Sequence, residues 1–292
     1  MAQIKLKTGN YSEIKLISLL KSDVYVEKIY GKKTIIGTKI TSLLFEYLLK
    51  YKKTALSLGL PICDTTYDRI IHGSKNSYFV EFQSYIPTNF EDFIRNTQDS
   101  RTLTIYIEKY LTFFHKVMKA DYPIGIDPST RNFGIDGNGE LIFFDFFPPH
   151  QKLTSNEYFL WPTPSITDRS FFISRYFSIL QVRVIYGQLL RHLAHNKLLS
   201  PATLKHLIGS ILGLESLKVL SISKTIKSRI LSSPSPHDMD IIRILACELC
   251  FEKKITLNQL TMVFKNTHIS NQNILNSQLS FAAITKILNK VM

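Results

Sequence analysis

The sequence predicts an α+β fold in which a small antiparallel β-sheet part precedes a larger, mainly helical part. Segments with alternating apolar residues, separated by turn signals, fill most of the first 84 residues. After residue 100, long segments carry apolar residues at three- and four-residue spacing. The 292 residues are 45% hydrophobic and 12% aromatic, which supports a well-buried core. We therefore expect two domains, residues 1–83 and residues 84–292.

Five strands and one helix are expected in the first part. The strand pattern occurs at Gln3–Lys7, Glu13–Leu20, Val24–Tyr30, Asp64–Ile71 and Ser77–Ser84. The helical pattern occurs at Thr38–Tyr51, where Leu44 and Leu48 lie on one face. Because short turns separate the first three segments, we expect these to be consecutive antiparallel strands.

The second part is expected to be helical on both sides of a central loop region. Residues 101–119 have a strong helical pattern and lead into that region, and residues 150–167 are irregular. Further helices are expected at residues 168–195, 201–213, 216–231, 238–251, 256–265 and 277–291.

The segment 122–149 holds three polar residues at a distinctive spacing. Asp127 is followed by four residues and then Asn132, and Asp145 comes thirteen residues later. The turn sequence at residues 136–139, Asp-Gly-Asn-Gly, predicts a hairpin that brings the ends of the segment together. Two acids and a carboxamide are oxygen ligands suited to magnesium held against phosphates. The hairpin strands are expected at Asn132–Ile135 and Leu141–Phe144.

This segment resembles the catalytic segment of the protein-kinase-like superfamily. The resemblance implies that Asp127 is catalytic and that Asn132 and Asp145 bind the metal. It also implies a two-lobe fold, because five strands and one helix are the layout of a kinase small lobe. The sequence departs from the protein-kinase pattern at three places. Gly125-Ile126 replaces the His or Arg before the catalytic Asp, no glycine follows Asp145, and Ser129 replaces a Lys.

With these departures, the segment resembles the aminoglycoside- and choline-kinase-like branch of the superfamily more than the protein kinases. Members of that branch phosphorylate small molecules. In the small lobe, the resemblance implies that Lys28 contacts the nucleotide phosphates and that Glu46, eighteen residues later, orients it. The alternative is that Lys28 is an ordinary lysine on the strand surface and that Glu46 is a solvated helix residue. Glu27, the neighbour of Lys28, could also pair with it in place of Glu46.

The resemblance also implies where the rest of a nucleotide binds. Gly9 and Ser12 lie where a loop covers the phosphates, although an ordinary hairpin turn remains an equal alternative. Backbone groups of Ser84, Tyr85 and Ile86 lie where the hinge between the lobes meets the base. The implied cofactors are Mg²⁺ and ATP or GTP.

The expected reaction moves the γ-phosphoryl group of a nucleoside triphosphate to a hydroxyl of a small molecule. Three alternatives stay open: a protein kinase, a non-catalytic pseudokinase or binding scaffold, and a basic nucleic-acid-binding protein. The net charge of +13 permits the last, but the basic residues are spread in short clusters without a known nucleic-acid-binding signature. We expect no membrane span, no nucleic-acid partner and a cytoplasmic location.

Overall fold

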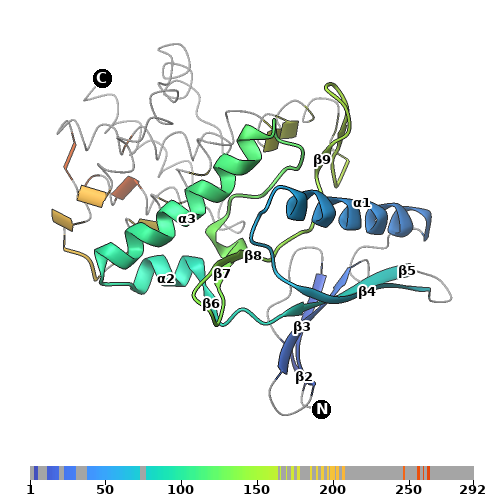
Figure 1. Ribbon diagram of the computed structural model, residues 1–292, viewed down its shortest axis with the longest axis horizontal. Helices are drawn as coiled ribbons and strands as arrows, with labels where there is room; N and C mark the ends of the chain where they lie inside the picture. The colour runs from blue at the N-terminus through green and yellow to red at the C-terminus, as the bar shows by residue number, and fades with distance from the viewer. Residues whose placement is uncertain are drawn as a thin grey trace. The chain divides into compact units, whose positions relative to one another are not determined.

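The computed structural model describes residues 3–5, 12–19, 23–30, 38–72 and 77–163, together with scattered residues between 165 and 263 (Figure 1). The chain groups into two compact units. The first comprises Met1–Phe90, Thr112–Asp127 and Arg131–Phe177, and the second comprises Glu91–Leu111, Pro128–Thr130 and Ser178–Met292. The domain boundary between residues 83 and 84 stays a prediction.

A five-stranded antiparallel sheet forms the N-terminal part of the first unit, with its strands in the order β1-β2-β3-β5-β4. Helix α1 (Thr38–Ser57) follows β3 in the chain and packs against β4 and β5. The expectation of an α+β fold with a small antiparallel sheet and one helix is confirmed. The strands are β1 (Gln3–Lys5), β2 (Ser12–Leu19), β3 (Asp23–Tyr30), β4 (Thr65–His72) and β5 (Ser77–Ser84).

Helix α1 buries one face against the sheet. Leu44, Leu48, Tyr51 and Ala55 recur at three- and four-residue spacing and are all buried. The helix continues to Ser57, so the end predicted at Tyr51 was wrong by nearly two turns. It stops before Gly59, which adopts a left-handed φ of 63°.

The expected hairpin is present, and a short strand extends it to a three-stranded sheet. The strands are β6 (Thr88–Asn89), β7 (Phe133–Ile135) and β8 (Leu141–Phe143), in that order. In the turn, the Asp136 carboxylate accepts hydrogen bonds from the backbone amides of Asn138 and Glu140, at 2.9 and 2.8 Å. This pairing explains why the Asp-Gly-Asn-Gly sequence closes the hairpin.

Aromatic rings fix the hairpin to the helix that precedes it. Helix α2 (Phe90–Asn96) is followed by α3 (Ser100–Lys119), close to the expected bounds. The Phe113 ring of α3 meets the Phe133 ring edge to face, with ring centres 5.1 Å apart, and Phe133 lies 5.1 Å from Phe143. All three side chains are buried. The hairpin is therefore held by tight packing as well as by its own hydrogen bonds.

The sequence predicted that residues 150–167 are irregular, but part of this segment has regular structure. It contains a small hairpin of β9 (Gln151–Lys152) and β10 (Tyr158–Phe159). The described residues between 169 and 193 are helical, and so are residues 202, 203, 206 and 207 within the helix expected at 201–213. The helices expected at residues 216–231, 238–251, 256–265 and 277–291 lie almost entirely outside the described residues. No helix in the described part is long and apolar enough to cross a membrane.

Candidate functional site

The two ends of the hairpin bring Asn132 and Asp145 together. Asn132 closes a short 3₁₀ turn (Thr130–Asn132) just before β7, and Asp145 lies two residues after β8. The backbone amide of Phe144 donates to the carbonyl oxygen of Asn132, with 3.1 Å between the two atoms. Because this bond is made by Asn132 itself and by the residue before Asp145, the two residues lie at the same edge of the hairpin.

Asp127 lies at the same edge, because Asn132 holds its backbone with a side-chain hydrogen bond. The Asn132 carboxamide nitrogen donates to the carbonyl oxygen of Asp127 at 3.3 Å. Burial raises the pKa of Asp145, and the charges of Asp127 and Glu81 raise it further, while Lys28 and the Phe147 amide oppose the rise. The two aspartates are thus close enough to repel one another.

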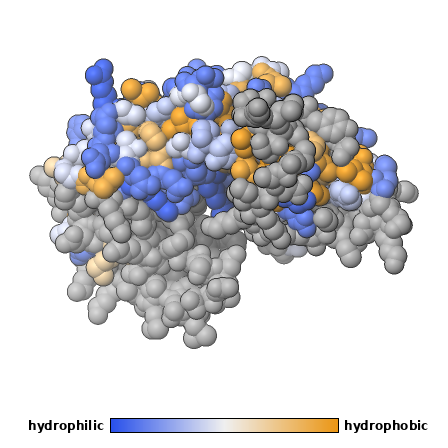
Figure 2. All heavy atoms as spheres, turned by 90° about the horizontal axis from the view of Figure 1, so that it is seen from below, coloured by the Kyte–Doolittle hydropathy of each residue, from blue (hydrophilic) through white to orange (hydrophobic). Residues whose placement is uncertain are grey.

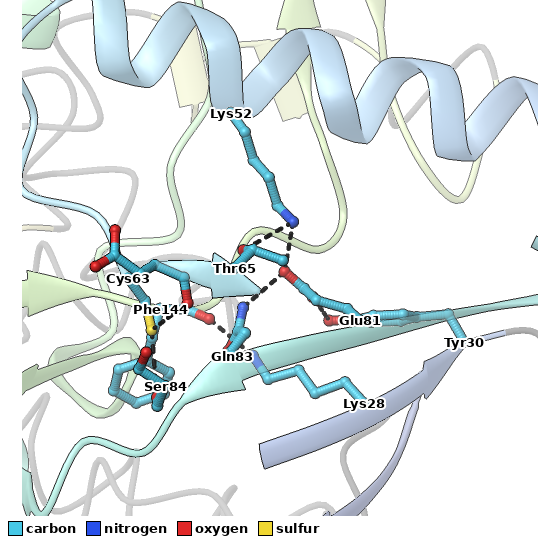
Figure 3. A network of polar contacts seen from close by, with 10 residues as sticks. Lys28, Tyr30, Lys52, Cys63, Thr65, Glu81, Gln83, Ser84 and Phe144 are labelled. Carbon is cyan, nitrogen blue, oxygen red and sulfur yellow. Dashed lines mark hydrogen bonds and ion pairs between the residues drawn. The ribbon is translucent and has the colours of Figure 1, made fainter. Parts of the chain in front are cut away.

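Lys28 reaches the same place from strand β3. Its side chain is buried, and its amine donates to the carbonyl oxygen of Phe144 at 2.7 Å (Figure 3). The amine also lies 5.5 Å from the centre of the Phe144 ring. Lys28, Asp127, Asn132 and Asp145, which span 118 positions of the sequence, therefore meet around Phe144.

Glu46 does not take part in this group, and the expected pair with Lys28 is a prediction that the structure contradicts. The Glu46 side chain is exposed on α1, and no ion pair joins it to Lys28 among the described residues. The inward-facing polar residue of α1 is Lys52, six residues later. Six residues turn a helix by about 240°, so Glu46 and Lys52 face different sides.

Lys52 forms a buried ion pair with Glu81 of β5. The Lys52 amine lies 2.7 Å from Glu81 Oε1 and donates to the Thr65 hydroxyl at 3.2 Å. Gln83 donates to the same carboxylate oxygen at 2.8 Å, and the Tyr30 hydroxyl donates to Oε2 at 3.0 Å (Figure 3). Burial acts to raise the pKa of Glu81, but Lys52, Lys28 and the hydrogen bonds outweigh it and lower the pKa.

The sequence reasoning missed Lys52, Glu81 and Gln83, although two signals pointed to them. Lys52 follows Leu48 by four residues and precedes Ala55 by three, so it lies in the apolar stripe of its helix. Glu81 and Gln83 alternate with Phe82 in a strand whose other residues are mainly apolar, and both are buried. A charged residue in phase with a buried face predicts a buried polar contact.

Two further side chains border the acidic group. The Tyr51 hydroxyl donates to the Gly125 carbonyl at 3.2 Å, and burial, with the charges of Asp145 and Asp127, raises its pKa well above the ordinary value. Burial raises the pKa of the Cys63 thiol to about 11, although nearby Lys28 acts to lower it. Both groups therefore stay protonated at neutral pH and act as hydrogen-bond donors.

The remaining predicted nucleotide contacts stay predictions. Gly9 lies outside the described residues, and Ser12 is the buried first residue of β2. The backbone amides of Ser84 and Tyr85 donate to the carbonyl oxygens of Asp64 and Val24, both at 3.1 Å. These two amides therefore already have hydrogen-bond acceptors within the protein.

The donor set fits a magnesium ion that phosphate oxygens also hold. Within the described part of the chain, no group of three His, Cys, Asp or Glu residues is close enough to bind a metal unaided. Asp145 and Asn132 nevertheless supply hard oxygen ligands of the kind that Mg²⁺ takes beside substrate phosphates. Burial is the main cause that raises the pKa of Asp145, with smaller contributions from the charges of Asp127 and Glu81, and a bound cation would favour the ionised carboxylate.

Comparisons with known proteins do not assign the chain to a family. No model of a protein family matches the sequence. No curated protein matches it. Among solved structures, the chain is similar to a MAP kinase from Leishmania major, with 9% identity and a TM-score of 0.45 over 98% of this chain and 93% of that one. A likeness this weak is no argument for a substrate, and nothing in it points to the aminoglycoside- and choline-kinase-like branch.

Proposed function

We propose that the chain is a magnesium-dependent phosphotransferase that moves the γ-phosphoryl group of ATP or GTP to a hydroxyl group. The observation that carries the proposal is the meeting of Lys28, Asp127, Asn132 and Asp145 around Phe144. One cation, two acids and a carboxamide at one edge can position an anionic donor and a neutral acceptor. Phosphoryl transfer requires mainly such positioning and charge compensation.

Each residue has a distinct role in this proposal. Asn132 and Asp145 would hold magnesium, which when bound compensates charge on the β- and γ-phosphates. Lys28 would contact the α- and β-phosphates. Asp127 accepts the proton of the acceptor hydroxyl while the acceptor oxygen bonds to the γ-phosphorus and the bond to the β-phosphate oxygen breaks. The leaving nucleoside diphosphate takes the electron pair of that bond.

The acceptor we propose is a hydroxylated small molecule. Protein kinases place a lysine two residues after the catalytic aspartate, and this chain has Ser129 there. A protein acceptor is equally consistent with the fold, so the experiment must separate the two. We also propose a cytoplasmic location and no nucleic-acid partner.

Nucleotide binding and phosphate transfer test the proposal in sequence. Magnesium with ATP or GTP should raise the melting temperature, since ligand at a hundred times its Kd adds about 2.7 kcal/mol to stability. Labelled phosphate should then appear on a member of a panel of hydroxylated metabolites and antibiotics. Asp127→Ala should leave the thermal shift nearly unchanged and slow transfer by about a hundredfold or more.

The other outcomes are equally informative. No thermal shift with any purine triphosphate at millimolar concentration contradicts the proposal. Nucleotide binding without transfer to any acceptor favours the pseudokinase alternative. Labelled phosphate on a protein, and on no small molecule, would show that the acceptor is a protein. Wild-type transfer by Asp127→Ala would show that Asp127 is not the catalytic residue.

A further inference from the structure

Lys28 and Glu81 lie directly opposite one another in the antiparallel pair of β3 and β5. Side chains at such paired positions project from the same face of a sheet, with their Cβ atoms about 5 Å apart. Both residues are buried, with 5% of Lys28 and none of Glu81 exposed. The charge of Lys28 is one of the influences that lower the pKa of Glu81. The Lys28 and Glu81 side chains therefore interact electrostatically on the face of the sheet that bears the site.

The position of the Glu81 carboxylate is defined from three elements. Helix α1 contributes Lys52, β3 contributes Tyr30, and β5 itself contributes Gln83. Oε1 receives two of these contacts and Oε2 receives the third. A carboxylate held by three donors cannot turn freely, so its negative charge has a fixed location.

A buried ammonium group needs such a fixed charge. The Lys28 amine donates its hydrogen bond within the described part of the chain to a neutral carbonyl, that of Phe144. Removing an ammonium group from water costs several kcal/mol unless charges nearby compensate it. Glu46 cannot do so from the exposed side of α1, whereas Glu81 lies across the strand pair.

We propose that Glu81 is the positioning residue for Lys28, and that Lys52 holds Glu81 in place. The carboxylate that orients the lysine is then on a strand, and helix α1 supplies an amine instead. The inference rests on the proposed function in one respect only, the contact of Lys28 with nucleotide phosphates. The position of the Lys28 amine against Phe144 can be tested without nucleotide.

The informative variant removes both charges of the buried pair while keeping its volume, Glu81→Gln with Lys52→Met. Replacing both members of a buried ion pair is often neutral for stability, whereas removing one member leaves an uncompensated charge. The Met side chain also suits the neighbourhood, because the Lys52 amine lies 5.1 Å from the Phe146 ring. The charge of Asp145 still acts on Lys28 in the double variant, so we expect this variant to fold, and thermal denaturation checks this.

A matched control exists on the opposite face of the same sheet. Lys15 and Glu27 are paired across β2 and β3, with 3.5 Å between amine and carboxylate, and both are partly exposed. Lys15→Met with Glu27→Gln makes the same chemical change without touching the site face. This control should leave both measurements described below unchanged.

The first measurement is the labelling rate of Lys28 by an amine-reactive ester at one pH, followed by mass spectrometry of its peptide. In the wild type, the buried and hydrogen-bonded amine should react slowly. In the double variant it should react at least about tenfold faster, the change that about 1.4 kcal/mol of lost stabilisation gives. An unchanged rate in the folded variant overturns the proposal.

The second measurement is the affinity for magnesium and ATP, which should fall by about tenfold in the double variant. If the wild type binds no nucleotide but Lys28 labelling still accelerates, the positioning role stands and the proposed function falls. If the double variant does not fold, Tyr30→Phe removes one contact of Glu81 while keeping the ring stacked on Phe79. Labelling of Lys28 should then rise by a smaller factor, and an unchanged rate overturns the proposal.

Discussion

At the scale of single residues, Asp145 carries a negative charge in an unfavourable place. Burial raises its pKa, Asp127 and Glu81 raise it further, and the opposing charge of Lys28 does not cancel the rise. A carboxyl group whose pKa is higher in the folded than in the unfolded protein lowers stability once it ionises. The loss begins above the ordinary pKa of 3.8 and is complete above the raised value.

Asp145→Asn should therefore stabilise the protein in the absence of nucleotide and magnesium. At pH 7 we expect the melting temperature to rise by a few degrees, the effect of about 1 kcal/mol in a protein of this size. The difference from wild type should shrink as the pH falls toward 4, because the Asp145 carboxyl takes up a proton in the folded protein as the pH falls through its raised pKa. Differential scanning calorimetry across this pH range measures it.

The same substitution should abolish most of the stabilisation by magnesium with nucleotide, because a neutral amide is a weaker magnesium ligand. Asp64→Asn is the control, since Asp64 is an exposed carboxylate close in sequence to β4. It should change neither the stability without ligand nor the ligand effect. A lower melting temperature for Asp145→Asn at pH 7 without ligand would contradict the electrostatic account.

At the scale of elements, the segment that leads into Asp127 lies tightly against the chain around β9. The Gly125 amide donates to the His150 carbonyl at 2.9 Å. A Cβ atom at Gly125 would lie 2.9 Å from Tyr176 Cβ, 2.9 Å from Phe177 Cζ and 3.0 Å from His150 Cβ. This packing explains why the chain has a glycine two residues before Asp127.

Gly125→Ala should destabilise the protein by about 1–3 kcal/mol, the usual cost of forcing an extra methyl group into a packed site. Gly137→Ala is the matched control, because nothing lies within 4 Å of a Cβ atom there. That change should stay within about 0.5 kcal/mol of wild type. Urea denaturation compares the two, and equal midpoints would show that the close packing at Gly125 is absent in solution.

At the scale of the whole molecule, the net charge of +13 should favour anionic ligands. On the face seen in Figure 2, hydrophilic and hydrophobic residues of the described part lie interspersed. A positive molecule attracts a nucleotide from a distance, and salt screens that attraction. The charge should thus affect how fast a nucleotide binds more than how fast it leaves.

Stopped-flow measurements with a fluorescent nucleotide and magnesium test this expectation. The association rate constant should fall about two- to fivefold between ~0.05 and ~0.5 M salt, with little change in dissociation. An association rate that ignores salt would rule out steering by the net charge. A generic DNA duplex is the comparison ligand, because steeply salt-dependent binding to it would favour the nucleic-acid alternative.

Local patterns in the sequence determined the α+β class, the hairpin and the convergence of Asp127, Asn132 and Asp145. Strand alternation, helical spacing and turn residues act over a few positions, so they can be read directly from neighbouring residues. The hairpin then joins groups that lie only eighteen positions apart.

Only the tertiary structure decided which buried charges pair. Lys52 and Glu81 are 29 positions apart, and Lys28 and Glu81 are 53 apart. Their contacts depend on the rotation of α1 about its axis and on the order of strands β3 and β5 in the sheet. The prediction of Glu46 rested on its separation from Lys28 along the sequence, which does not define how α1 is rotated. A helix rotated by two residues would have brought another side chain inward. Packing of the apolar face of α1 on the sheet fixes that rotation, and the energy of a buried charge depends on the result.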